Sequence, residues 1–305
     1  LTEQSVLSSQ TNEGSMQLPS FVSCLDAPPP CSCHWTLDPR PRYRSARYNT
    51  EPTREGRKMG VATVQFYSHA LGRRTTYEAI LPDTGTGPYP VLLELHGLFD
   101  DHNSWIHKSK LVHYVSDMEL IVIMPDGATS AYLDWPTQTH ERLNRQYYET
   151  MIVDDLWNEV HRNFNVDSQK WAIGGLSMGG YGAMRLGLRH PDKFASIWAH
   201  SAAFVIGDAV PALGLADIED ASLHELVPKL RGRSDLPVIS FDCGTEDELI
   251  ESNRDFHKLL DELGIEHLYA EHPGGHTWEY WDEHIREALP QHETVLGVKR
   301  ETLQW

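Results

Sequence analysis

A serine flanked by glycines follows an apolar run in the middle of the chain, and this feature limits the possible folds most strongly. Residues 171–180 read W-A-I-G-G-L-S-M-G-G, which places Ser177 in a G-x-S-x-G pattern. The residues before the pattern predict a strand and those after it predict a helix. A serine between the two lies on a sharp turn that only small neighbours allow. The pattern therefore predicts a nucleophile at Ser177, with a buried serine in a glycine-rich turn as the alternative.

A serine hydroxyl needs a base, and the base needs an orienting acid. His276 follows two glycines just after a predicted strand and precedes a predicted helix. Four carboxylates lie in or just after the strand predicted at 237–243, at Asp242, Glu246, Asp247 and Glu248. Asp242 falls inside that strand, whereas Asp247 lies beyond it, where the chain can turn its carboxylate toward a histidine. We therefore predict His276 as the base and Asp247, in preference to Glu246, as the acid.

Backbone amides that could hold a carbonyl oxygen are expected on both sides of the serine. A buried strand is predicted at 91–96, and Gly97 after it allows the loop to fold over the site. The amide of Leu98 is one predicted donor, and the amide of Met178, directly after the serine, is the other. For the side chain of His96, we expect a structural role in bracing this loop.

The order of elements predicts an α/β fold with a mostly parallel central sheet covered by helices on both faces. Strands and helices alternate after residue 59, and no internal repeat is visible. Strands are predicted at 60–68, 73–81, 91–96, 120–124, 170–176, 195–201, 237–243 and 266–271. Helices are predicted at 107–117, 146–164, 178–190, 222–230, 249–263 and 278–289.

Seven short motifs lie along the chain: L-H-G-L at 95–98, H-N-S-W at 102–105, M-P-D-G at 124–127, Y-E-T at 148–150, G-G-L-S-M-G-G-Y at 174–181, G-T-E-D at 244–247 and G-G-H-T-W at 274–278. Together they resemble the esterase D-like branch of the α/β-hydrolases. That branch includes tributyrin-type esterases, S-formylglutathione hydrolases, feruloyl and acetylxylan esterases, and mycolyltransferases. The resemblance implies Ser177 as nucleophile, Asp247 as acid and His276 as base, with the Leu98 and Met178 amides as the oxyanion hole. It also implies a small cap near 204–236.

Four aromatic residues are predicted near the edge of the site and could line a substrate pocket. Ordinary packing is the alternative for each of them. An apolar wall with few polar anchors suits short, uncharged acyl groups. The four residues are Trp105, Tyr132, Trp135 and Trp278.

Charge and composition limit the kinds of molecule that the protein is expected to bind. The chain has 305 residues and a formal net charge of −18, from 44 acidic and 26 basic residues. Such a charge disfavours nucleic acid and anionic membranes, so a small ester is the expected partner, with a homo-oligomer left open. No apolar run of about 18 residues predicts a membrane span, and no apolar signal opens the chain. We expect a cytoplasmic protein, and leave export open because a cleaved signal would leave no trace.

The first 58 residues differ from the rest and are predicted to be an extension with little structure of its own, or a docked arm. They contain Cys24, Cys31 and Cys33, whose pairing the sequence does not determine. The spacing of Cys31, Cys33 and His34 is not that of an ordinary zinc site, so no metal is expected. The catalytic domain is predicted to span 59–305.

These features predict a serine carboxylesterase for short-chain acyl esters, which works through an acyl-enzyme and needs no cofactor. An S-formylglutathione hydrolase-like thioesterase and a feruloyl or acetylxylan esterase are the alternatives with the same triad. A binding protein that has lost its chemistry is the alternative from another class.

Overall fold

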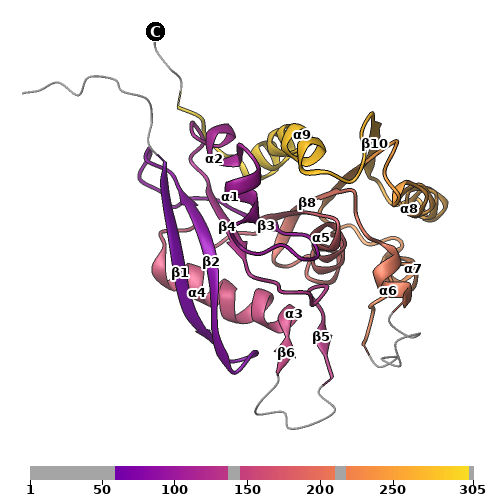
Figure 1. The fold of residues 1–305 in the computed structure, drawn as a ribbon, viewed down its shortest axis with the longest axis horizontal. Coiled ribbons are helices and arrows are strands. Elements are labelled where there is room, and N and C mark those ends of the chain that lie inside the picture. The colour runs from indigo at the N-terminus through magenta and orange to yellow at the C-terminus, as the bar shows by residue number, and fades with distance from the viewer. Residues whose placement is uncertain (1–58, 137–144, 210–217, 302–305) are drawn as a thin grey trace, which may run out of the picture. The chain divides into compact units, whose positions relative to one another are not determined.

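A computed structural model describes residues 59–136, 145–209 and 218–301 (Figure 1). The predicted extension at 1–58, with its three cysteines, lies outside the described residues, as does part of the predicted cap, at 210–217. Among the described residues, no helix has the length and apolar character needed to cross a bilayer.

A central sheet of eight strands has the order β1-β2-β4-β3-β7-β8-β9-β10 (Figure 1). The first two strands pair antiparallel with each other, and β2 pairs antiparallel with β4, while every pair from β4 to β10 is parallel. All eight predicted strands are present, with ends shifted by at most two residues. They are β1 (Gly60–Ser68), β2 (Arg73–Leu81), β3 (Val91–Leu95), β4 (Ile121–Pro125), β7 (Trp171–Leu176), β8 (Phe194–His200), β9 (Val238–Gly244) and β10 (Leu268–His272).

Helices cover both faces of this sheet, as predicted. The first layer packs α1, α2 and α9 against one face, and the second packs α4, α5, α7 and α8 against the other. Every residue of β3, β4 and β7 is buried, which is why these strands read as almost continuous apolar runs, with Glu94 in β3 as an exception. The helices are α1 (Ser104–Lys108), α2 (Leu111–Tyr114), α3 (Tyr148–Thr150), η1 (Met151–Leu156), α4 (Trp157–Asn163), α5 (Met178–Arg189), α6 (Val205–Ala209), α7 (Leu223–Leu226), η3 (Val227–Leu230), α8 (Ile250–Leu263) and α9 (Trp278–Leu296).

Some predicted helices differ from the observed ones. The helix predicted at 107–117 is two short helices, α1 and α2, and the one predicted at 146–164 includes the π-helical segment η1. Helix α9 continues through Pro290 to Leu296, seven residues beyond its predicted end at residue 289. Burial of Leu289 and His292 against the sheet outweighs the hydrogen bond that proline cannot make. A short pair of strands, β5 (Asp134–Trp135) and β6 (Gln146–Tyr147), was not predicted.

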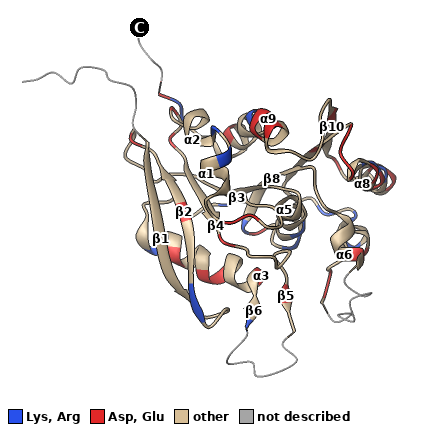
Figure 2. Cartoon of the chain, in the orientation of Figure 1, with Lys and Arg blue, Asp and Glu red and all other residues tan. Residues whose placement is uncertain are grey.

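Acidic residues lie on helices of both layers, including α4, α8 and α9 (Figure 2). One group of buried charges forms a compensated cluster around Glu149. Glu149 accepts hydrogen bonds from Arg185 at 2.6 Å, Arg189 at 2.9 Å and His190 at 2.8 Å. Arg185 is 1% exposed and also donates from Nε to the carbonyl oxygen of Asp220 at 2.7 Å. The cluster therefore joins α5 to residues 219–220, which lie within the predicted cap.

Glu149→Gln is expected to lower the free energy of unfolding at pH 7 by roughly 3–5 kcal/mol, because buried cations lose their partner. Burial alone would raise the pKa of Glu149, but hydrogen bonds from His190 and Arg185 and the charges of Arg185 and Arg189 lower it from 4.5 to about 2. The contribution of the carboxylate is therefore complete above about pH 4.5 and is lost as the pH falls through about 2. Urea unfolding of both proteins should show a smaller difference at about pH 3 than at pH 7. An equal difference at both pH values would contradict this assignment.

Candidate active site

Ser177 lies on the turn between β7 and α5. Its φ and ψ are 53° and −117°, a conformation that costs an L-residue roughly 1–3 kcal/mol. The turn is held because the Ser177 N–H donates to the carbonyl oxygen of His200 at 2.9 Å. Glycine is required at position 179, where a Cβ would lie 2.5 Å from the carbonyl oxygen of Leu95. The strained turn raises the Ser177 hydroxyl at the carboxyl end of the parallel strands, as the G-x-S-x-G pattern predicts.

His276 lies in the loop between β10 and α9, beside this serine. Gly274 has a φ of 136°, and Thr277 caps α9, so the loop is fixed on both sides of the histidine. The imidazole packs edge-on against Trp281, with ring centroids 4.9 Å apart. Its Nε2 lies 2.9 Å from Ser177 Oγ. Both atoms can therefore share a proton.

Asp247 lies in the loop after β9 and is 2% exposed. Its Oδ2 is 2.8 Å from His276 Nδ1, and its Oδ1 accepts the N–H of Leu249 at 2.8 Å. Burial alone would raise the pKa of Asp247, but these hydrogen bonds from His276 and Leu249 hold it below its usual value. The carboxylate stays ionised near neutral pH and orients the imidazole with Nδ1 protonated, which leaves the Nε2 lone pair toward Ser177.

The other carboxylates near Asp247 have different environments. Asp242 is fully buried and accepts hydrogen bonds from the side chains of Trp198, His200 and Tyr280. Burial alone would raise the pKa of Asp242, but the charge and hydrogen bond of His200 and the other two donors lower it. Glu246 has an exposed side chain, and its N–H donates to the carbonyl oxygen of Gly274 at 2.8 Å. That backbone bond joins the loop of the acid to the loop of the histidine.

The two amides predicted to hold an oxyanion lie on either side of Ser177. A Cβ at Gly97 would lie 3.5 Å from Ser177 Cβ, so the loop before Leu98 closes directly over the serine. Within the part of the chain that the structure describes, the N–H groups of Leu98 and Met178 have no hydrogen-bond partner. Two unpaired donors beside a nucleophile can stabilise a developing negative charge.

His96 holds the first of these amides in place. The side chain is 1% exposed, its Nε2 accepts the N–H of Gly127 at 2.9 Å, and its Nδ1 donates to the carbonyl oxygen of Gly97 at 2.7 Å. Burial lowers the pKa of His96, which favours this neutral form. Because the carbonyl of Gly97 and the N–H of Leu98 belong to one planar peptide, fixing the first orients the second. The histidine thus has the bracing geometry that the sequence analysis expected.

A family model described as "Putative esterase" matches residues 68–292, most of the chain. The chain belongs to this esterase family. An acetyl esterase from Caldicellulosiruptor saccharolyticus is 29% identical over 268 residues, which cover 76% of this chain and 97% of that protein. The predicted family and enzyme class, a carboxylic ester hydrolase, are therefore confirmed.

Solved structures show the same fold. The crystal structure of an S-formylglutathione hydrolase from Staphylococcus aureus is 25% identical with a TM-score of 0.67, and the match covers 77% of this chain and 99% of that one. A ferulic acid esterase from the anaerobic fungus Anaeromyces mucronatus is 20% identical with a TM-score of 0.60, covering 78% and 91%. The esterase therefore has the predicted α/β-hydrolase fold.

Two of the four aromatic residues predicted at the pocket lie in the core of the esterase instead. Trp105 is 1% exposed and donates from its indole to the carbonyl oxygen of Leu95 at 3.1 Å. Tyr132 is 0% exposed and donates to the carbonyl oxygen of His96 at 3.0 Å. Neither side chain can line an open cavity, because both are buried, and each instead holds the backbone at the end of β3 through one hydrogen bond.

The other two predicted pocket residues are half-buried. Trp278 packs edge-on against Trp105, with ring centroids 5.2 Å apart, and Lys108 Nζ lies 5.3 Å from the centroid of its ring. Trp135 donates from its indole to the carbonyl oxygen of Ser130 at 2.6 Å. A role for either one in binding substrate remains a prediction.

The sequence analysis missed three exposed apolar side chains near Ser177. Leu98 is 44% exposed and Phe99 is 88% exposed, both on the loop that carries the predicted oxyanion amide. Val205, which is 48% exposed, begins α6, two residues after Ala203, whose N–H donates to the Ser177 carbonyl oxygen at 3.0 Å. The positive φ of Phe99, 67°, could not be read from a phenylalanine in the sequence. These three side chains lie on the two chain segments that contact the Ser177 turn.

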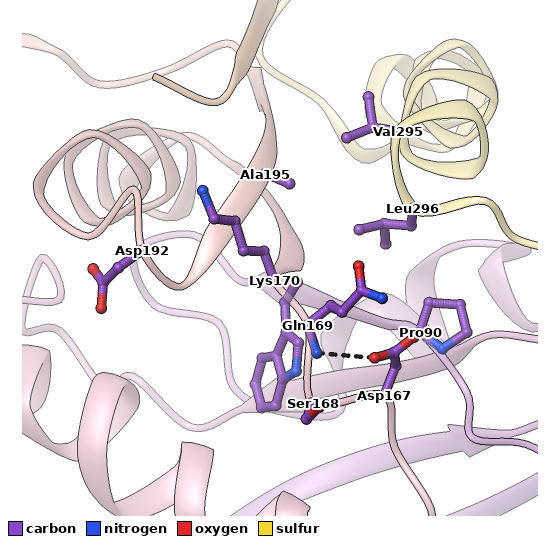
Figure 3. A pocket seen from close by; sticks show the side chains of 10 residues that line it. Pro90, Asp167, Ser168, Gln169, Lys170, Asp192, Ala195, Val295 and Leu296 are labelled. Carbon is purple, nitrogen blue, oxygen red and sulfur yellow. Dashed lines mark hydrogen bonds between the residues drawn. The ribbon is translucent and has the colours of Figure 1, made fainter. Parts of the chain in front are cut away.

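A cavity of about 410 Å³ lies between the chain before β3 and the start of β7, and Figure 3 shows the side chains that line it. Its lining includes Pro90, just before β3, and Trp171, the first residue of β7. Ser177 follows the other end of the same strand. The cavity is therefore at the amino ends of the strands, away from the residues that the esterase could use for chemistry.

Tyr132→Phe is expected to lower kcat several-fold and the free energy of unfolding by about 1–2 kcal/mol, because the buried carbonyl oxygen of His96 loses its donor. Ester hydrolysis and urea unfolding measure the two effects. Tyr89→Phe is the matched control, since the Tyr89 hydroxyl donates to the carbonyl oxygen of Thr84 before β3 begins, at the opposite end of the strand. The control should lose stability only. Equal kcat values for the two variants would argue against a role for Tyr132 in holding the loop.

Proposed function

We propose that the protein is a serine carboxylesterase that hydrolyses short-chain acyl esters through an acyl-enzyme. The observation that carries this proposal is the hydrogen-bonded line from Ser177 Oγ to His276 Nε2 and from His276 Nδ1 to Asp247 Oδ2, at 2.9 and 2.8 Å. Nucleophile, base and orienting acid are in the relative positions that acyl transfer needs.

In the first half of the reaction, His276 takes the proton of Ser177 as Oγ attacks the ester carbonyl carbon. The carbonyl oxygen becomes an oxyanion between the amides of Leu98 and Met178. Asp247 stabilises the protonated imidazole, which then gives its proton to the departing alcohol. In the second half, water replaces the alcohol, His276 takes its proton, and the acid leaves as Ser177 is restored. Removal of one oxyanion donor typically costs roughly 3 kcal/mol of transition-state stabilisation.

The preference for short, uncharged acyl groups is supported by two observations. Leu98, Phe99 and Val205 are exposed apolar side chains on the segments next to Ser177, where they would form an apolar rim. The relative that is 29% identical is named an acetyl esterase. An apolar rim binds a short acyl or alcohol group by burial and offers a charged substrate little.

The test is hydrolysis of p-nitrophenyl acetate, butyrate, octanoate and laurate, together with labelling by a serine-reactive phosphonate. We expect kcat/KM to fall steeply with chain length, and the phosphonate to modify Ser177, as located by mass spectrometry of the peptide. Turnover that rises toward laurate would overturn the short-chain assignment. Labelling at a different residue, or no labelling of the folded protein, would overturn the mechanism and favour a protein that has lost its chemistry.

A thioesterase is the second candidate, because a solved relative with a TM-score of 0.67 is an S-formylglutathione hydrolase. Ser177, with the same base and acid, would attack a thioester carbonyl, and glutathione thiolate would be the leaving group. Comparing kcat/KM for S-formylglutathione with that for p-nitrophenyl acetate separates the two activities. Methyl ferulate, measured in parallel, tests the feruloyl esterase alternative. A strong preference for either substrate would replace the short-chain ester in the proposal.

A further inference from the structure

Asp242 lies beneath the site, and its carboxylate joins three strands and helices. It is on β9, two residues before that strand ends at Gly244, and it is fully buried. Its Oδ2 accepts the indole N–H of Trp198 at 2.6 Å and the Nδ1–H of His200 at 2.7 Å, both from β8. Its Oδ1 accepts the hydroxyl of Tyr280, on α9, at 2.8 Å. The proposed reaction uses none of these four side chains.

His200 connects this carboxylate to the nucleophile. The imidazole of His200 bonds Asp242, and the carbonyl oxygen of His200 accepts the N–H of Ser177 at 2.9 Å. The next residue, Ser201, has a φ of 43° and donates its N–H to the carbonyl oxygen of Asp242 at 2.7 Å. Asp242 therefore fixes the end of β8 through both its side chain and its main chain, directly behind the strained Ser177 turn.

Tyr280 connects the same carboxylate to the base. Its buried ring packs against Gly274, where a Cβ would lie only 2.8 Å from Cδ2 of the ring. Its N–H lies 3.5 Å from Oγ1 of Thr277, the residue that caps α9. Gly274 and Thr277 are the residues on either side of His276 that fix its loop. The bond from the Tyr280 hydroxyl to Asp242 therefore determines where that loop lies relative to the sheet.

The hydrogen bonds to Asp242 are charge-assisted. Burial alone would raise the pKa of Asp242, but the charge and hydrogen bond of His200 and the other two donors lower it. A carboxylate that stays ionised near neutral pH makes stronger hydrogen bonds than a neutral acceptor does. Loss of one partner would leave a buried polar group unpaired, which is costly. The carboxylate therefore holds β8, β9 and α9 in fixed relative positions.

We propose that Asp242 is a positioning residue that sets the separation between Ser177 Oγ and His276 Nε2. That separation is 2.9 Å, short enough for proton transfer. The two atoms come from loops that are far apart in the sequence, and Asp242 bonds the residues that support both loops. A displacement of about 1 Å can lower the rate of an enzyme roughly 100-fold. The inference rests on the proposed function, and it concerns the alignment of the triad.

Tyr280→Phe tests the proposal, because it removes the bond to the carboxylate and keeps the ring against Gly274. We expect kcat for p-nitrophenyl acetate to fall roughly 10-fold or more, with KM within about twofold of the wild type. Ser240→Ala is the matched control. Ser240 is buried on the same face of β9, two residues before Asp242, and its hydroxyl donates to Gln291 Oε1 on α9. Both variants lose one bond between β9 and α9, so both should be less stable in urea, whereas only Tyr280→Phe should lose kcat.

Asp242→Asn tests the carboxylate itself. The asparagine oxygen can still accept hydrogen bonds from Trp198 and His200, but its NH₂ group replaces Oδ1 and cannot accept the Tyr280 hydroxyl proton. We therefore expect kcat to fall with KM nearly unchanged. Because the two substitutions break the same link, the double variant with Tyr280→Phe should have a kcat within about twofold of the slower single variant. Losses that multiply in the double variant would contradict a shared link.

A measurement that needs no turnover is ¹⁵N NMR of the histidine-labelled full chain, with the Nε2 signal of His276 assigned by its absence from His276→Gln. Ser177→Ala, which lacks the Oγ contact, gives the signal of a separated pair. Tyr280→Phe should shift toward that signal, and Ser240→Ala should keep the wild-type one. Tyr280→Phe that matched Ser240→Ala in both kcat and NMR would overturn the proposal. Wild type that hydrolysed no ester would overturn the proposed function instead, and the NMR comparison would still show whether Asp242 holds the two side chains together.

Discussion

Replacing Ser177 by alanine is expected to reduce kcat for p-nitrophenyl acetate by roughly 10⁴-fold or more. The hydroxyl is the group whose Oγ lies 2.9 Å from His276 Nε2, and alanine leaves nothing to attack the carbonyl. Binding and the oxyanion amides alone would account for the residual rate. The backbone of the turn should persist, because its hydrogen bonds to His200, Tyr181 and Ala203 use only main-chain atoms of Ser177. The measurement is steady-state kinetics combined with urea unfolding.

Ser68→Ala is the matched control for this prediction. Ser68 is a buried serine at the end of β1, and its hydroxyl donates to the Asp155 carboxylate at 2.6 Å. Its removal should lower the free energy of unfolding by about 1–3 kcal/mol and leave kcat unchanged. Ser177→Ala is therefore expected to lower kcat and keep the turn, whereas Ser68→Ala is expected to lower stability and keep kcat. A Ser177→Ala enzyme that retained a tenth of the wild-type kcat would exclude Ser177 as the nucleophile.

The geometry around Ser177 was predictable because it depends on local rules. A strand followed by G-x-S-x-G and a helix forces the sharp turn, and the structure has it with a φ of 53°. Asp247 could be preferred over Asp242 because a residue within a strand has its side chain committed to one face of the sheet. In the structure, Asp242 is committed to Trp198, His200 and Tyr280 beneath the site. Both predictions used distances of only a few residues along the chain.

The pocket was less predictable because its walls come from contacts that sequence patterns do not encode. Trp105 and Tyr132 follow strand ends, as pocket residues do, but each has a polar atom that reaches a backbone carbonyl, at Leu95 and His96. A ring buried behind the loop is removed from water, and its polar atom can still make this hydrogen bond. Phe99, by contrast, is exposed on a strained backbone. A single sequence does not distinguish an aromatic side chain that supports a loop from one that projects from it.

The predicted helix boundaries were wrong where tertiary packing outweighs the local preference of the sequence. The last helix was predicted to end at residue 289, yet α9 continues through Pro290 to Leu296 because His292 is buried, with its Nδ1 2.8 Å from Ser196 Oγ on β8. The positions of Asp242 and Tyr280 illustrate the same limit. They are 38 residues apart in the sequence, and only the packing of α9 against the sheet brings the hydroxyl within 2.8 Å of the carboxylate.

Asp247→Asn is expected to reduce kcat by roughly 10³–10⁴-fold with the fold retained. Asparagine has the same shape, and its oxygen can still accept the N–H of Leu249, which Oδ1 accepts at 2.8 Å in the wild type. Its NH₂ group then faces His276 Nδ1, where Oδ2 now lies at 2.8 Å. Because two N–H groups cannot face each other, the imidazole proton moves to Nε2. That nitrogen faces Ser177 and can no longer accept its proton, so kcat falls while KM changes little.

The neighbouring carboxylate provides the decisive comparison. Glu246→Gln makes the same chemical change one residue away, on an exposed side chain, and should leave kcat within about twofold of the wild type. The pKa of Asp247 lies below its usual value, so its contribution to stability is present at neutral pH and is lost as the pH falls through that lowered pKa. Asp247→Asn should therefore be less stable than the wild type at pH 7 and approach it in acid. A large loss of kcat in Glu246→Gln with activity retained in Asp247→Asn would assign the acid to Glu246, because only the group that holds the Nδ1 proton can change the tautomer that Ser177 meets.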